Sequence, residues 1–255
     1  MIDEAKIGRM LFAVVFLVFG LQCFIFSKFV LGLEPVPAAL VPPVPWAWAN
    51  GVVLIGAGLC LLADRSGRIG ALVLAGVFLS SVVVFEGPSL IAQPKNAADD
   101  VFHTLAVAAA ALVLAAEVKG PPRWDRLMAY GGLAGRLIFG VCTIGHGVMH
   151  FVFFKFTADF IPAWIPFHGF WAAFTGVAQI AAGLAILSGV LARLAATLTA
   201  IMYGSWALIV HVPRIMAAPT SRSEWTDLVI ASALCASALI VAGALSHRSA
   251  AGKGG

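Results

Sequence analysis

Charged residues are scarce in this sequence. Lysine, arginine, aspartate and glutamate together make up only 11% of its 255 residues, whereas 61% of the residues are hydrophobic. Soluble domains carry about 25% charged and about 45–50% apolar residues, so this chain has too few polar side chains to cover a water-soluble globule. The scarcity of charge excludes a soluble fold for nearly the whole chain, and we expect the lipid bilayer to be its solvent.

Closely spaced cysteines and catalytic motifs are also missing. The four cysteines, Cys23, Cys60, Cys142 and Cys235, lie far apart inside apolar runs, so neither a CxxC zinc site nor a redox dithiol is indicated. The sequence has no phosphate loop, no HExxH motif and no Ser–His–Asp order, which argues against nucleotide chemistry and classical hydrolysis. No basic run is dense enough to bind nucleic acid, and the net charge of +4 is better explained by basic cytoplasmic loops.

Long apolar runs are abundant instead. A transmembrane helix needs about 20 mostly apolar residues, and eight runs meet this requirement. They cover residues 8–30, 46–63, 68–87, 101–118, 130–155, 169–188, 191–212 and 225–246. We therefore predict an all-α fold class, a polytopic membrane protein with eight transmembrane helices. The first run lacks a small-residue cleavage pattern, so we interpret it as a retained helix and not as a signal peptide.

Lysine and arginine are distributed unequally between the two sides of this topology. Eleven of the 16 fall on the side that carries both termini, and five fall on the other side. Because cytoplasmic loops are enriched in Lys and Arg, we expect both termini to be cytoplasmic. Tryptophans at the outer span ends are typical of an interfacial aromatic belt, and these are Trp46, Trp48, Trp164, Trp171 and Trp225.

The two halves of the chain repeat each other. The segment that begins at Ile7-Gly-Arg recurs at Ala134-Gly-Arg with a shift of 127, and after the first loop the shift becomes 125. The matched pairs include polar and aromatic residues at span ends, namely Lys28 with Lys155, Trp46 with Trp171, Arg68 with Arg193 and Pro88 with Pro213. We predict a first four-helix repeat at 1–120, a cytoplasmic linker at 121–133 and a second repeat with a short polar tail at 134–255. An even number of spans per repeat makes the repeats parallel.

Ionisable side chains inside spans are energetically costly and mark candidate functional sites. His146 and His150 lie one turn apart in the outer half of the fifth span, and His211 lies near the outer end of the seventh. Residues four apart share a helix face, so we expect these histidines to face the interior of the second bundle. Trp171 and Trp206 are the aromatic residues that could form an apolar wall beside them.

Several ligands would suit this set of side chains. A histidine beside an aromatic pocket is typical of a quinone or lipid site, whereas imidazoles at i and i+4 also suit zinc, copper or iron. A haem would need axial ligands on facing helices, which His150 and His211 could supply. The structural alternative is that the histidines only satisfy backbone carbonyls, or each other, within the bundle.

The second half also resembles a known family. It contains Gly135-Arg136 at the start of a span, Gly147-Val-Met-His150-Phe151, the loop Phe160-Ile-Pro-Ala-Trp-Ile-Pro166 and then Phe170-Trp171. This pattern resembles the DoxX-like family of small bacterial four-helix membrane proteins, and the repeat extends the resemblance to the first half. The family is named for a membrane subunit of a thiosulfate:quinone oxidoreductase, and many of its members have no assigned activity.

The resemblance implies a multi-pass protein of the bacterial cytoplasmic (inner) membrane. It favours an integral membrane subunit of a redox or respiratory-type assembly, with a quinone or lipid pocket near the outer leaflet and with other membrane or periplasmic redox subunits as partners. Such a partner would carry the redox cofactor, because this chain has no flavin or iron–sulfur signature. The alternatives are a small-solute or lipid carrier and a structural membrane module without chemistry of its own. Whether this chain is itself enzymatic stays open.

Overall fold

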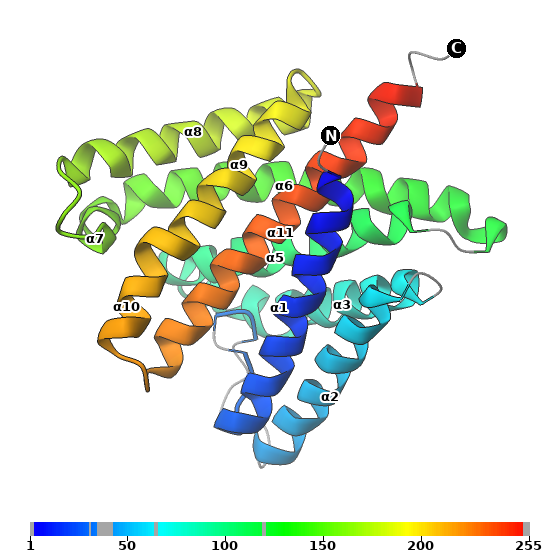
Figure 1. Cartoon of the computed structure of the whole chain (residues 1–255), viewed down its shortest axis with the longest axis horizontal. Helices are drawn as coiled ribbons and strands as arrows, with labels where there is room; N and C mark the ends of the chain where they lie inside the picture. The colour runs from blue at the N-terminus through cyan, green and yellow to red at the C-terminus, as the bar shows by residue number, and fades with distance from the viewer. Residues whose placement is uncertain (1–2, 31, 35–42, 64–65, 119–120, 252–255) are drawn as a thin grey trace.

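The chain folds into helices and short connections (Figure 1). The computed structural model describes residues 3–30, 32–34, 43–63, 66–118 and 121–251. The expected breaks at Asp64-Arg65 and Lys119-Gly120, and the last residues of the polar tail, lie outside these ranges. The described part of the chain contains helices and no strands, which confirms the all-α fold class.

The first half forms four spans. Its helices are α1 (Glu4–Phe26), α2 (Pro43–Leu62), α3 (Gly67–Ser81), the π-helix η1 (Val82–Glu86), α4 (Gly87–Ala92) and α5 (Pro94–Glu117). The elements α3, η1 and α4 follow one another directly and together make the third span.

The second half repeats this order. Its helices are the short 3₁₀ turn η2 (Pro122–Trp124), α6 (Asp125–Val152), α7 (Phe154–Phe160), α8 (His168–Ser188), α9 (Ala192–Trp206), the π-helix η3 (Ala207–His211), α10 (Val212–Ala217) and α11 (Arg222–Ala251). The helix α6 begins inside the segment 121–133 that we assigned to a linker, and α7 is a short helix in the connection between the fifth and sixth spans.

Eight of these helical segments are long and apolar enough to cross a bilayer, as the sequence predicts. Their most apolar windows have mean hydropathies between 1.5 and 2.4. Many of their outward side chains are large and apolar, for example Leu208 and Ile201. Exposed apolar surface on this scale is unsuited to water, so the protein is a multi-pass membrane protein surrounded by lipid.

Close glycine contacts join the first two spans of each half at equivalent places. A Cβ atom added to Gly20 on α1 would lie 2.7 Å from the carbonyl oxygen of Gly51 on α2. A Cβ atom added to Gly147 on α6 would lie 2.6 Å from the carbonyl oxygen of Gly176 on α8. Small residues allow such close backbone approach in membrane bundles. These four glycines are matched by the sequence repeat, so the repeat is visible in packing as well as in sequence.

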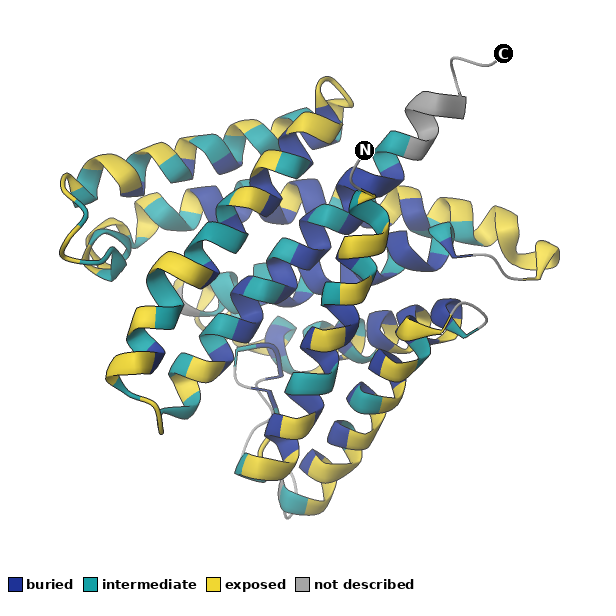
Figure 2. Cartoon of the chain, in the orientation of Figure 1, coloured by how far each residue is buried: buried dark blue, intermediate teal, exposed yellow. Residues whose placement is uncertain are grey.

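The fourth helix of each half packs against the first helix of the other half. The helix α1 contacts α11, and α6 contacts α5, while α5 and α11 also touch each other near the middle of the molecule (Figure 1). Gly8 lies against Ile240, and its repeat counterpart Gly135 lies against Val113. The two halves therefore form one eight-helix bundle through reciprocal contacts. Their central helices, α5 and α11, have the largest buried shares of the eight spans (Figure 2).

Each half contains one π-helical turn at the same place. The turns η1 and η3 end at Glu86 and His211, which the repeat pairs with each other, and a proline follows two residues later in both cases. A proline has no backbone N–H to donate to the helix. The π turn, with its wider hydrogen-bond spacing, directly precedes the short helix that contains the proline. The third and seventh spans therefore continue to Ala92 and Ala217, beyond the prolines at which we predicted them to end.

Candidate functional site

His150 lies in a cluster of polar and aromatic side chains contributed by α6, α8 and α9. Its Nε2 atom is 3.2 Å from the side-chain nitrogen of Gln179, and its Nδ1 atom is 3.2 Å from the carbonyl oxygen of Ala172 and 3.1 Å from the hydroxyl of Thr175. The ring stacks on Trp206 at a centroid distance of 5.3 Å and an interplanar angle of 24°. The half-buried imidazole is therefore held on its edges by hydrogen bonds and on one face by an indole.

These partners define the state of the His150 ring. The amide nitrogen of Gln179 can only donate, so Nε2 of His150 accepts, and Nδ1 carries the proton. That N–H donates to Ala172, and Thr175 donates its own proton to the carbonyl of Trp171 at 2.7 Å. The arrangement leaves the side-chain oxygen of Gln179 buried and without a hydrogen-bond partner. The site therefore offers one free acceptor next to a neutral imidazole.

His146 lies one turn earlier on α6 and faces a different set of neighbours. Its Nδ1 atom is 2.9 Å from the hydroxyl of Tyr203 on α9. Its ring is near His103 and Phe102 of α5, at centroid distances of 4.7 and 6.1 Å. His146 therefore lies at the junction of the two halves, whereas we expected it to face the second bundle alone.

Aromatic contacts join the two histidines into one network. Tyr203, which contacts His146, packs edge-on against Trp206 at 5.5 Å, and Trp206 stacks on His150. The network therefore runs from His146 to His150 through two side chains of α9. It extends from the junction with the first half into the second half.

The first half carries apolar or small residues at the equivalent positions. The shifts of 127 and 125 pair His146 with Phe19, Tyr203 with Phe78, His150 with Cys23 and Gln179 with Leu54. All four counterparts are fully buried. At these four positions the first half therefore carries apolar or small side chains. Its own polar contacts lie nearby, where Asn50 donates to Glu34 at 2.7 Å and contacts the sulfur of Cys23 at 3.9 Å.

The other two predicted residues lie apart from this network. His211, at the end of η3, packs against Phe160 at 6.2 Å, and the guanidinium of Arg214 lies 4.0 Å from the same ring. Trp171 packs against Phe170 and Phe174. Within the described residues, no hydrogen bond or ring contact joins the side chain of His211 or Trp171 to His146 or His150. The structure therefore brings together His146, His150 and Trp206 out of the five predicted residues.

Two neighbouring residues were missed by the sequence reasoning. Asp99 and His103 lie one turn apart near the start of α5, and His103 contacts His146 across the junction. Their i, i+4 spacing was the available signal. This spacing was overlooked because polar residues at the end of a span usually face water. In addition, the sequence repeat does not show that α5 packs against α6.

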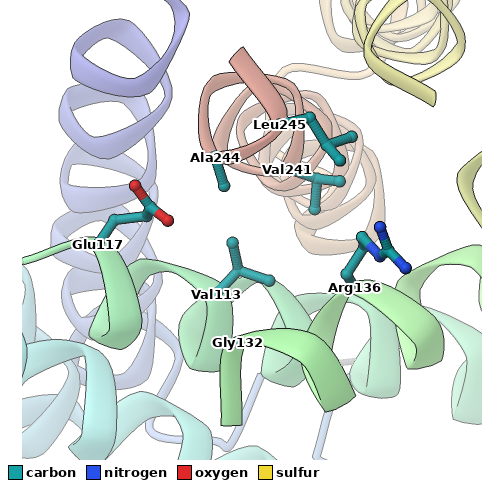
Figure 3. Close-up of a pocket in the computed structure, with 7 residues that line it drawn as sticks. All are labelled: Val113, Glu117, Gly132, Arg136, Val241, Ala244 and Leu245. Carbon is teal, nitrogen blue, oxygen red and sulfur yellow. The ribbon is translucent and has the colours of Figure 1, made fainter. Parts of the chain in front are cut away.

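A small pocket lies at the opposite ends of these helices. Glu117 of α5 and Arg136 of α6 flank it, and apolar side chains close it (Figure 3). The apolar lining comes from Val113, Val241, Ala244 and Leu245. The pocket is separate from the histidine network, because Arg136 lies almost three turns before His146 on α6.

Comparison with known proteins identifies a family. The sequence model of the DoxX family matches two regions, residues 5–87 and 131–212. Each region covers the first three spans of one half, in agreement with the tandem repeat. No curated protein and no solved structure matches the chain.

Proposed function

Because this chain belongs to the DoxX family of membrane proteins, as two tandem units, we propose that it is the integral membrane subunit of a redox or respiratory-type assembly. Its second half binds the headgroup of a quinone near the outer leaflet. A membrane or periplasmic partner subunit supplies the redox cofactor.

The cluster of side chains around His150 is the observation that carries this proposal. A quinone headgroup is a flat ring with oxygen atoms at two ends, so its site needs an aromatic surface and polar groups at the rim. Trp206 supplies the surface, and His150 and Gln179 supply the polar groups. The free oxygen of Gln179 can accept a hydrogen bond from the hydroxyl of the reduced, quinol form.

The position of the His150 cluster also fits a lipid-borne ligand. Val177 on α8 and Leu208 just after α9 are exposed apolar side chains on the two helical segments that enclose it. A quinone dissolved in the bilayer can approach between these helices without crossing water. The imidazole of His150 can exchange a proton with the headgroup, since its Nε2 atom carries a lone pair, which here accepts from Gln179.

Binding of a short-chain ubiquinone to the purified protein in nanodiscs, measured by calorimetry, tests the proposal. The variants His150→Cys and Gln179→Leu each introduce the residue that the first half carries at the equivalent position. Each variant loses a polar contact to the headgroup worth about 1 kcal/mol, so we expect about fivefold to tenfold weaker binding.

The first half supplies the matched control. Cys23→Ala changes the counterpart of His150 and should leave ubiquinone binding unchanged. Binding that is unaffected by His150→Cys and Gln179→Leu, in variants that elute as the wild-type protein does, would contradict a headgroup site at His150.

A further inference from the structure

Three metal-ligating side chains converge at the junction of the two halves. Asp99 and His103 extend from α5, and His146 extends from α6. Each offers one ligand atom, and these atoms lie within 4.8 Å of one another. His103 Nδ1 and Asp99 Oδ2 lie 3.8 Å apart. From this cluster we propose that Asp99, His103 and His146 bind a divalent transition-metal ion of the zinc class.

The state of His146 is the second observation that points to a ligand. The residue is only 5% exposed, and its Nε2 atom is buried without a hydrogen-bond partner. Buried polar atoms in folded proteins are nearly always paired. A metal ion bound to Nε2 provides the missing partner.

Tyr203 completes the arrangement that a metal-bound histidine requires. A ligating imidazole normally donates its other N–H to an oxygen atom, which fixes the ring and its tautomer. Nδ1 of His146 is 2.9 Å from the hydroxyl of Tyr203. Donation of the Nδ1 proton to Tyr203 leaves the lone pair of Nε2 free for the ion.

The donor set determines the class of metal. Two imidazole nitrogens and one carboxylate oxygen suit zinc, copper, nickel or iron, whereas magnesium and calcium prefer oxygen ligands alone. Ligand atoms around a tetrahedral zinc ion lie about 3.4 Å apart, so the three side chains must move slightly closer to bind it. The side chains of Asp99 and His103 are 44% and 22% exposed, which leaves them room to rotate and gives the ion a path from the outer face.

The site is a property of the junction and not of either repeat. Two ligands come from the first half, and the third comes from the second half together with Tyr203. In the first half the counterparts of His146 and Tyr203 are Phe19 and Phe78, which cannot ligate a metal. A bound ion would therefore tie α5 to α6 at a single place in the molecule.

Cobalt binding to the full-length protein in nanodiscs tests the proposal, because the visible absorption of Co²⁺ reports its coordination. We expect the wild-type chain to bind one Co²⁺ with the spectrum of a mixed nitrogen and oxygen site. Zinc should displace the ion, whereas magnesium and calcium should not. The variant His146→Phe, which copies Phe19, and the variant Asp99→Asn should each weaken binding more than about tenfold, and Tyr203→Phe should weaken it about tenfold to a hundredfold.

The controls separate this site from general histidine binding and from the quinone proposal. His168→Ala removes a histidine of the same outer layer and should leave Co²⁺ binding unchanged. Asp99→Asn alters a partly exposed side chain, so the test remains decisive even if His146→Phe does not fold. Equal Co²⁺ binding by the wild-type and Asp99→Asn proteins would overturn the metal site, whereas loss of ubiquinone binding in His150→Cys concerns the quinone proposal alone.

Discussion

At the scale of single residues, the two halves place different side chains at equivalent positions of a shared scaffold. Phe19 and Phe78 pack as buried rings in the first half, whereas His146 and Tyr203 form a hydrogen bond in the second. A polar pair in a low-dielectric interior is favourable only when its groups are satisfied. At these two positions the second half carries polar groups where the first half packs apolar rings, which supports the proposal of a ligand site in the second half.

The carboxyl group of Glu34 should make stability depend on pH. Glu34 follows α1 outside the spans, is only 7% exposed, and accepts hydrogen bonds from the backbone N–H of Val30 at 3.2 Å and from Asn50 at 2.7 Å. Burial raises its pKa from 4.5 to about 7, and the two hydrogen bonds oppose that rise. The folded state therefore binds the proton more tightly than the unfolded state does.

The direction of the effect follows from this raised pKa. Between pH 4.5 and about 7 the folded state holds more protons at Glu34 than the unfolded state does. The stabilisation that protonated Glu34 provides is therefore fully present below pH 4.5 and is lost as the pH rises to about 7. Thermal unfolding in detergent should show a decrease in the midpoint over this window. Glu34→Gln keeps an acceptor oxygen and should flatten the profile and raise the midpoint above pH 7. An unchanged profile in Glu34→Gln would contradict this role of Glu34.

At the scale of helices, the sequence predicts the spans well and their contacts less well. Eight apolar runs and matched pairs such as Lys28 with Lys155 were sufficient to predict eight helices in two similar halves. The third and seventh spans were predicted to end at residues 87 and 212, but they continue to Ala92 and Ala217, because the sequence pattern does not reveal the π turn that lets the helix pass the proline. Close glycine contacts are equally hard to read from sequence: Gly56 is exposed, and a Cβ atom there would meet nothing within 4 Å.

The close approach of α6 and α8 leads to a prediction about Gly147. Its added Cβ atom would lie 2.6 Å from the carbonyl oxygen of Gly176 and 2.8 Å from the side chain of Ile180. Gly147→Ala must push these helices apart and should destabilise the bundle by about 1–3 kcal/mol, seen as a lower thermal midpoint.

Gly76 provides the matched control for this substitution. It lies within α3, where a Cβ atom would meet nothing within 4 Å. Gly76→Ala should leave the midpoint unchanged or raise it, because alanine is the better helix former by about 1 kcal/mol. If Gly147→Ala and Gly76→Ala behaved alike, the close packing of α6 on α8 would not be a determinant of stability.

At the scale of the whole molecule, reciprocal packing decides where the candidate site lies. The sequence repeat is compatible with two arrangements: the four helices of each half could pack only among themselves, or the fourth helix of each half could pack against the other half. The sequence alone therefore could not place α5 beside α6. For that reason His146 and His150 were identified from sequence, but Asp99 and His103 were not. The clustering of polar groups toward one side of the bundle was predictable from their positions in the spans.

The even number of spans also leads to a prediction about topology. The start of α1 and the end of α11 lie together, with Gly243 packed against Ala5. The excess of Lys and Arg on that side predicts that it is cytoplasmic. Reporter fusions after Gly120 and after Gly254 should both give a cytoplasmic signal. A periplasmic signal from either fusion would reverse the orientation and place the histidine network at the inner leaflet.

The central claim is that only one half of the duplicated scaffold binds the ligand. Photolabelling with an azido-quinone in native membranes tests this claim most directly. Labelled peptides can be assigned to either half by mass spectrometry, because the repeats differ in sequence. We predict labels on α8 and α9, around Gln179 and Trp206, that excess unlabelled quinone prevents. Equal labelling of α2 and α3 in the first half, or labelling confined to the pocket of Glu117 and Arg136, would contradict the account.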